Sequence, residues 1–305
     1  MKKYAVIDVG TNNVLLLIAK KQNDSFQIID RKSEISALGK NFKNKQLTEA
    51  ALNRVKRILT DFIEFSKFLT NDIFVVGTSV SREAKNIYVL KNWLKRKYNL
   101  DYDIISGEME GYFNGIANIR DFPNQDSIIL FDVGGGSTEF TLIKNKKVKS
   151  VKSIDLGIRR LDNLFGANFF QKLGYTQNIL NKKITSLKKE TGLLVGIGGT
   201  VTSLSAIKQK LREYKFEKVH KSMLSYEDIK SIFCQFNKLD KKEIKKKMPF
   251  QPARADIMLI GTMIIKEIVS FFAKDKIWIS DKGMQFGYLD YKDKPDLYPG
   301  VHFEN

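Results

Sequence analysis

The chain has 305 residues, of which 43% are hydrophobic and 11% aromatic, enough to bury one large core or two cores of ordinary size. Its 52 lysines and arginines exceed its 34 aspartates and glutamates, and the formal net charge of +18 attracts polyanions without identifying one. A single cysteine and two histidines exclude an internal disulfide and a zinc-type cluster, and no segment approaches the roughly 18 uninterrupted apolar residues of a membrane span.

The first predicted elements are two strands, a helix and a third strand. Residues 4–19 contain two apolar, β-branched runs separated by a polar turn, which predicts a β-hairpin. Apolar residues recur at helical spacing over 48–69, with Thr48 as the expected N-cap. The short apolar run 73–76 predicts a buried strand.

The alternation of strands and helices then continues. We expect a helix over 84–98, a strand over 102–105, and a further helix that begins at Ser106 or Gly107. Such alternation is typical of an α/β lobe with a partly parallel sheet.

The hydrophobic pattern restarts after a turn-rich segment. Residues 127–134 form a second apolar strand that carries Asp132 near its end, as the first strand carries Asp8. A turn of small residues and another strand follow in each case, which indicates an internal repeat. We therefore expect two α/β lobes, residues 1–122 and residues 123–305, with a cleft between them.

Two glycine-rich turns are candidates for phosphate binding. The first comprises Gly134, Gly135, Gly136 and Ser137. Its glycines permit backbone angles at which successive N–H groups converge on one anion, although an ordinary glycine-rich hairpin would have the same sequence. The second comprises Gly198, Gly199 and Thr200. It lies between an apolar strand and a helix, where amides and the helix dipole attract anions, but it lacks the spacing of a dinucleotide fingerprint and the lysine of a P-loop.

Four charged side chains are candidates for chemistry. Asp8 and Asp132 each end a strand and could hold Mg²⁺ or another divalent cation, or simply cap a turn. Glu108 and Glu110 stand two residues apart on the expected helix, so only one of them can face a site. Arg82 follows a strand, where its guanidinium could bind phosphate oxygens or lie on the surface.

Taken in order along the chain, these segments resemble the exopolyphosphatase/guanosine pentaphosphate phosphatase (Ppx/GppA) family. The matching blocks are residues 8–12, 77–84, 104–110, 132–139 and 196–200, followed by an Arg-Ala-Asp block at 254–256. The resemblance implies a two-lobed actin/sugar-kinase/Hsp70-like (ribonuclease H-like) fold with its active site in the interlobe cleft.

The resemblance also implies roles for the candidate residues. Glu110, rather than Glu108, would be the base that orients the attacking water; Asp132 would bind Mg²⁺ or position the water; and Arg82 would neutralise developing charge. The residues that would bind phosphate are Thr11, Asn12, Gly134, Gly135, Gly136, Ser137, Gly198, Gly199 and Thr200.

The expected activity is that of a cytoplasmic exopolyphosphatase that releases orthophosphate from inorganic polyphosphate. Alternatives are a guanosine pentaphosphate phosphohydrolase, a kinase of the same fold, and a non-catalytic polyphosphate-binding regulator. No membrane or specific nucleic-acid partner is expected, and a homodimer is left open.

The sequence departs from the family pattern at two places. Asn13 and Leu15 stand where serine and often a basic residue are usual, and Gln285 and Phe286 stand in place of an Arg-Glu pair. The chain also resembles a short form of the family without its C-terminal HD-like domain, and its last ~20 residues are expected to pack back on the first lobe.

Overall fold

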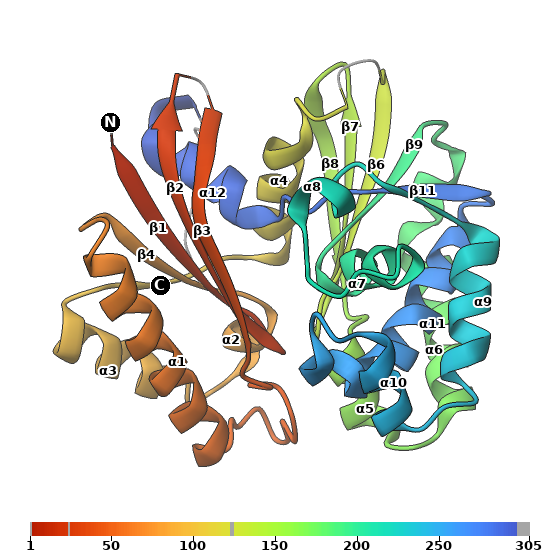
Figure 1. The fold of residues 1–305 in the computed structure, drawn as a ribbon, viewed down its shortest axis with the longest axis horizontal. Coiled ribbons are helices and arrows are strands. Elements are labelled where there is room, and N and C mark those ends of the chain that lie inside the picture. Colours follow the sequence, from red (N-terminus) through yellow and green to blue (C-terminus); the bar gives the residue numbers. More distant parts are fainter. Residues whose placement is uncertain (1, 24, 123–124, 298–305) are drawn as a thin grey trace. The chain divides into compact units, whose positions relative to one another are not determined.

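The computed structural model describes residues 2–23, 25–122 and 125–297 (Figure 1). Their Cα atoms form two compact units: one contains the residues up to Glu110 and those from Gln285 onward, and the other contains Gly111–Met284. Each unit has one β-sheet with helices packed on it, so the predicted α/β class is confirmed. The division into lobes after residue 122 stays a prediction, because compactness does not show which segments fold independently.

The first unit is built on a five-stranded sheet of order β3-β2-β1-β4-β5. Strands β1, β2 and β3 are antiparallel neighbours, whereas β4 and β5 continue the sheet in parallel with β1. The elements of this unit are β1 (Lys3–Val9), β2 (Asn13–Gln22), β3 (Ser25–Ile35), α1 (Glu49–Lys67), β4 (Ile73–Gly77), α2 (Ser79–Glu83), α3 (Tyr88–Tyr98), β5 (Tyr102–Ile104), the start of α4 (Gly107–Asn118), α12 (Met284–Asp293) and a 3₁₀ turn at Pro295–Leu297.

The predicted hairpin and first helix are confirmed. Strands β1 and β2 pair from Lys3 opposite Lys20 to Val9 opposite Val14. Helix α1 begins after Thr48, whose hydroxyl accepts the Ala51 N–H at 3.2 Å. This bond satisfies one of the helix's unpaired amides, which is why a threonine followed by an amphipathic run starts a helix here.

The prediction of one helix over 84–98 is wrong for its first turn. The structure has a short α2 and then α3 from Tyr88, because Ala84 between them is extended, with φ −78° and ψ 116°. Outside contacts stabilise this break: the Lys85 N–H donates to Lys45 O at 2.8 Å, and the Asn86 side chain exchanges two hydrogen bonds with the backbone of Leu47. Tertiary hydrogen bonds thus replace those of a continuous helix.

The second unit is built on a six-stranded sheet of order β10-β11-β9-β6-β7-β8. Its elements are the rest of α4 from Gly111, β6 (Ser127–Val133), β7 (Thr138–Lys144), β8 (Lys147–Ile154), α5 (Ile158–Phe165), α6 (Phe169–Ile184), β9 (Leu193–Ile197), α7 (Gly199–Lys208), α8 (Phe216–Val219), β10 (Met223–Ser225), α9 (Tyr226–Phe236), α10 (Lys241–Lys247), α11 (Ala255–Phe271), β11 (Lys276–Ile279) and 3₁₀ turns at Thr185–Lys189 and Pro252–Arg254.

The internal repeat appears in the strand registers of the two sheets. Asp8 in β1 pairs with a residue of the antiparallel β2 and of the parallel β4, and Asp132 in β6 pairs in the same way with β7 and β9. The turns also match, since Gly10 N–H donates to Asn13 O at 2.9 Å and Gly134 N–H donates to Ser137 O at 3.0 Å. Asp8 and Asp132 are each the second-last residue of their strand, and β1 and β6 are each the first strand along the chain in their sheet.

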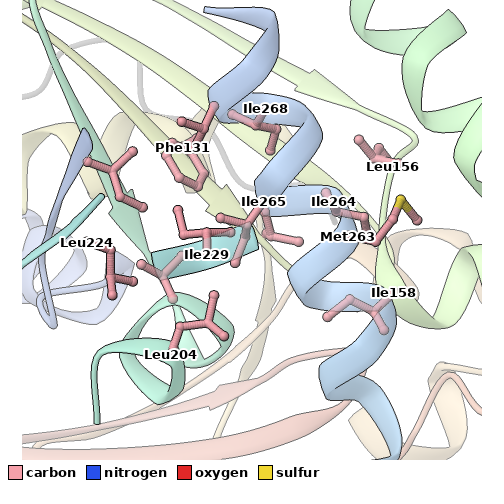
Figure 2. Packing of buried hydrophobic residues seen from close by; sticks show 14 of the residues in the cluster. Phe131, Leu156, Ile158, Leu204, Leu224, Ile229, Met263, Ile264, Ile265 and Ile268 are labelled. Carbon is pink, nitrogen blue, oxygen red and sulfur yellow. The ribbon is translucent and has the colours of Figure 1, made fainter. Parts of the chain in front are cut away.

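The core of the second unit surrounds α11, which is apolar on nearly every side (Figure 2). Ile264, Ile265 and Ile268 of this helix are fully buried in the same core cluster as Phe131 of β6 and Ile229 of α9. Full burial of such a side chain contributes about 1.5–3 kcal/mol, so α11 anchors one face of the sheet. No helix in the described part of the chain has the length and apolarity needed to cross a bilayer.

Candidate functional site

In the first unit, the candidate turn after β1 is fixed by hydrogen bonds to main-chain groups of other segments. The Thr11 hydroxyl accepts the Val80 N–H at the start of α2 at 3.3 Å, and Thr11 O accepts the Gly39 N–H at 2.8 Å. Asn12 O accepts the N–H groups of Ser36 and Ala37. Thr11 and Asn12 are consequently buried and held in one conformation, and the Thr11 hydroxyl retains its own hydrogen for donation.

Arg82 and Glu110 lie together in the same unit, although 28 residues separate them. Arg82 Nη1 donates to Glu110 Oε2 at 3.1 Å and to the carbonyl oxygen of Ile105 at 2.8 Å. Both side chains are largely buried, 16% and 14% exposed. The two hydrogens of Nη1 are therefore committed, which leaves Nη2 and Nε with three further N–H groups.

The two glutamates at the start of α4 have different surroundings. Glu108 is exposed, whereas Glu110 is held against Arg82. Burial raises the pKa of Glu110 above the ordinary carboxyl value, and the charge and hydrogen bond of Arg82 offset part of this effect. A carboxylate with a raised pKa accepts a proton more readily than an ordinary surface glutamate does.

In the second unit, the glycine turn after β6 packs against the start of α5. The N–H groups of Ile158 and Arg159 donate to Gly134 O and Gly135 O at 3.1 and 2.7 Å, and Arg160 Nε donates to Gly136 O at 2.5 Å. These contacts turn three successive carbonyls toward α5.

This arrangement determines where the amides of the turn point. Because the described peptide bonds are trans, the C=O and N–H of each peptide point in opposite directions. The N–H groups of Gly135, Gly136 and Ser137 are therefore directed away from α5. Three neighbouring amides that face one way form the kind of concave donor set that binds phosphate.

Close approach of the turn to α5 requires a glycine at position 157. A Cβ there would lie 2.4 Å from the carbonyl carbon of Gly136 and 2.6 Å from that of Gly135. Both neighbours are backbone atoms that cannot rotate away. The glycine turn and α5 thus hold each other in place through main-chain contact.

Asp132 lies against the second glycine turn. A Cβ added to Gly198, which has φ +87°, would lie 2.4 Å from Asp132 Oδ1, so the carboxylate occupies the space beside that glycine. The other oxygen, Oδ2, accepts a hydrogen bond from Asn114 Nδ2 at 3.2 Å. The predicted residues Asp132 and Gly198 are therefore neighbours, whereas Asn114 is a neighbour that sequence reasoning missed.

The second glycine turn leads into α7, and the buried side chain of Arg254 packs on it. A Cβ on Gly199 would lie 2.2 Å from the two terminal nitrogens of Arg254, so the guanidinium packs directly on this glycine. Arg254 is 5% exposed, and burial lowers its pKa to about 10, so it is still charged at neutral pH. A cation at the N-terminus of α7 strengthens the attraction of that turn for anions. Arg254 was noted in a motif but was not predicted as a site residue.

The second unit offers a donor set that fits a divalent cation. Among the described residues there is no cluster of three or more His, Cys, Asp or Glu side chains. Mg²⁺, however, is usually bound by one or two carboxylates together with water and substrate phosphate. The Asp132 carboxylate supplies oxygen atoms of the required kind, and the adjacent Asn114 has a buried Oδ1 without a hydrogen-bond partner in the described chain, the kind of atom to which a metal-bound water donates. Asp8 provides a single carboxylate in the first unit.

The residues that depart from the family pattern near the end of the chain serve packing. Gln285 Nε2 donates to Leu15 O at 3.2 Å, and both Gln285 and Phe286 are buried. Further along α12, Tyr288 donates to Asp103 Oδ2 at 2.5 Å and Lys292 donates to the same oxygen at 3.0 Å. These contacts attach α12 to the sheet of the first unit.

The two sheets share one strand order and carry an aspartate at the same register position. This repeat defines an α/β protein of the actin-like class. Solved structures that match this fold along nearly the whole chain include the following two. The Ppx/GppA family member of Aquifex aeolicus has 28% sequence identity and a TM-score of 0.79, over 96% of this chain and 98% of that one. An exopolyphosphatase from Cytophaga hutchinsonii, 24% identical, has a TM-score of 0.83 over 95% and 97% of the chains and supports the fold.

The family model described as the Ppx/GppA phosphatase family matches residues 17–294, and this chain belongs to that family. A bifunctional 3-dehydroquinate synthase/phosphatase of Fusobacterium nucleatum is 32% identical over 93% of this chain and 46% of its own length. Exopolyphosphatase 2 of Mycobacterium tuberculosis is 24% identical over 88% of this chain and 90% of its own. A guanosine-5′-triphosphate,3′-diphosphate pyrophosphatase of Pseudoalteromonas translucida is 28% identical over 75% and 49%. The chain thus spans about half the length of two of these relatives.

Proposed function

We propose that this protein removes the terminal phosphate of inorganic polyphosphate by hydrolysis and releases orthophosphate. The observation that carries the proposal is the Arg82–Glu110 pair: a largely buried carboxylate with a raised pKa, held by a guanidinium at 3.1 Å. Membership of a phosphatase family and the likeness to an exopolyphosphatase of similar length support it.

In the proposed reaction, Glu110 acts as the general base. It takes a proton from water as the water oxygen forms a bond to the terminal phosphorus, while the bond from that phosphorus to the bridging oxygen breaks. The shortened polyphosphate leaves with the electron pair of the broken bond. Arg82 holds the carboxylate in one orientation through Nη1, and its remaining N–H groups are available to a phosphate oxygen.

The main-chain amides of two turns are proposed to bind the phosphate oxygens. The N–H groups of Gly135, Gly136 and Ser137, directed away from α5, would hold the phosphate in the second unit. Gly198, Gly199 and Thr200 would add the N-terminus of α7 in that unit, and Thr11 and Asn12 are the proposed phosphate-binding residues of the first unit.

The reaction is proposed to need Mg²⁺ or another divalent cation. Asp132 is the residue of the second unit that would hold the cation, with Asn114 donating to its carboxylate, and Asp8 is the candidate ligand of the first unit. When bound, it would supply positive charge that offsets the charge of the phosphate oxygens. The cytoplasmic location and a homodimeric state remain predictions.

A second candidate substrate is guanosine pentaphosphate. Its 5′ triphosphate end presents the same anhydride, and a relative 28% identical to this chain is named for a guanosine-5′-triphosphate,3′-diphosphate substrate. The proposed chemistry at the phosphorus would be unchanged.

The test compares orthophosphate release by the wild type with that of Glu110→Gln and Glu108→Gln. Both variants change a glutamate to its amide on the same turn of α4, but Glu108 is exposed. Defined polyphosphate and guanosine pentaphosphate are supplied separately with Mg²⁺. We expect activity to fall about 10²- to 10⁴-fold in Glu110→Gln, the effect of losing a general base, and to persist in Glu108→Gln.

Other outcomes would replace the proposal. Equal activity in both variants would remove Glu110 from the mechanism. Polyphosphate binding without release of phosphate at any Mg²⁺ concentration would favour a non-catalytic regulator. Transfer of phosphate from ATP to an acceptor, without polyphosphate hydrolysis, would favour a kinase.

A further inference from the structure

The polar face of α4 in the second unit leads from Asp132 to the segment that follows β11. Asn114 and Asn118 lie four residues apart on this helix, 1% and 0% exposed, and are therefore on the same side of it. Buried carboxamides in a helix need hydrogen-bond partners, so each should have a specific contact.

The helix is held close to the sheet by its glycines. A Cβ on Gly111 would lie 2.4 Å from Val151 of β8, and one on Gly115 would lie 2.6 Å from Val148 of the same strand. The Thr141 hydroxyl in β7 also donates to Gly111 O at 2.7 Å. This close packing brings the short side chain of Asn114 within reach of Asp132.

The orientation of Asn114 follows from the chemistry of its partner. An ionised carboxylate only accepts hydrogen bonds, so the NH₂ group of the amide must face Asp132 Oδ2, as observed at 3.2 Å. The opposite oxygen of Asp132 lies against Gly198, where a Cβ would come within 2.4 Å. Contacts on both sides thus limit rotation of the Asp132 carboxylate.

The next turn of the helix is hydrogen-bonded to the segment that follows β11. Asn118 Nδ2 donates to Asn114 O at 2.8 Å and to Lys282 O at 2.9 Å. The Lys282 ammonium in turn contacts Asp121 Oδ1 at 2.8 Å, and His220 Nε2 lies 3.6 Å from the other oxygen. The bonds from Asn118 therefore connect the segment after β11 to α4, one turn beyond Asn114.

We propose that Asn114 is a positioning residue for Asp132: its amide holds one carboxylate oxygen so that the carboxylate is oriented before a divalent cation binds. The inference rests on the proposed function, in which Asp132 binds that cation. Partners that orient a metal-binding group commonly change metal affinity by about 10- to 100-fold when they are removed. Asn114 would act in this way without touching the reacting atoms.

The experiment measures binding of Mn²⁺ alone to the full chain, by the loss of free-ion EPR signal, for the wild type, Asn114→Ala and Asn114→Leu. Alanine removes the donor, and leucine removes it while filling the space so that water cannot replace it. Thr141→Val is the matched control, because it loses a buried hydrogen bond to the same helix without touching Asp132. We expect about 10- to 100-fold weaker Mn²⁺ binding in both Asn114 variants and wild-type affinity in Thr141→Val.

Thermal melts of the same samples separate weaker binding from unfolding. Wild-type Mn²⁺ affinity in either folded Asn114 variant would overturn the inference, as would equal weakening in Thr141→Val. If both variants fail to fold, a wild-type crystal structure with Mn²⁺ decides: Asn114 turned away from Asp132 would contradict it. A wild type that neither binds Mn²⁺ nor releases phosphate would instead refute the proposed function.

Discussion

Replacing Gly157 by alanine tests how the glycine turn is held. Gly157 is extended, with φ −154° and ψ 154°, a conformation that any residue adopts, so the substitution acts only through crowding. The new Cβ would lie 2.4–2.6 Å from backbone atoms of Gly135 and Gly136. The turn and α5 must separate, and the carbonyls that now accept from α5 would lose their alignment.

The magnitude follows from the nature of these neighbours. Overpacking against atoms that cannot rotate away costs about 1–3 kcal/mol, and the thermal midpoint should fall by several degrees. Because the separation also reorients the amides of Gly135, Gly136 and Ser137, we expect a higher KM for polyphosphate as well as a lower kcat.

Gly174→Ala is the matched control for this variant. Gly174 lies within α6 on the exposed side of the helix, and a Cβ there would meet no atom within 4 Å. Alanine should stabilise the helix by about 0.5–1 kcal/mol and leave the kinetics unchanged. The assay combines differential scanning calorimetry with steady-state phosphate release. Wild-type stability and KM in Gly157→Ala would refute the reasoning about backbone contact.

Two further predictions concern the first unit. Because the base must be ionised and burial raises the pKa of Glu110, kcat/KM should fall as the pH drops through a value above the ordinary carboxyl range, and a limb at an unshifted carboxyl pKa would contradict this. Tyr288→Phe should destabilise the chain by about 1.5–3 kcal/mol in urea unfolding, because it removes a partly buried hydrogen bond from a buried tyrosine to the Asp103 carboxylate. Tyr88→Phe, at an exposed tyrosine, should change little, and equal effects of the two substitutions would argue against the Asp103 contact.

Sequence reasoning predicted the elements whose residues carry a strong local pattern. The two strands that end near Asp8 and Asp132 are continuous apolar runs followed by glycine, so their ends could be placed to within a residue or two. Strand β3 was missed, because residues 25–35 are rich in polar groups and only partly buried. The break after Ala84 was missed because it depends on bonds to residues 45 and 47, which are distant in sequence.

The surroundings of the candidate residues depend still more on the tertiary structure. The sequence could say that only one of Glu108 and Glu110 faces inward, and the fold supplies Arg82 as the partner of the second. Asn114 gave one usable signal, its position four residues after Glu110 on the same helix face. Nothing local to Asn114 indicated that a strand from a different part of the chain would bring Asp132 to it.

The glycine turn beside α5 has a consequence for how such a site would be lost in evolution. Its proposed donors are main-chain amides, which are present whatever side chains the turn carries. Loss of a charged candidate residue such as Glu110 would therefore leave these amides in place, whereas one added methyl group at position 157 would displace them. An inactive descendant of this protein could retain each acidic and basic candidate residue and differ only where a glycine has acquired a side chain.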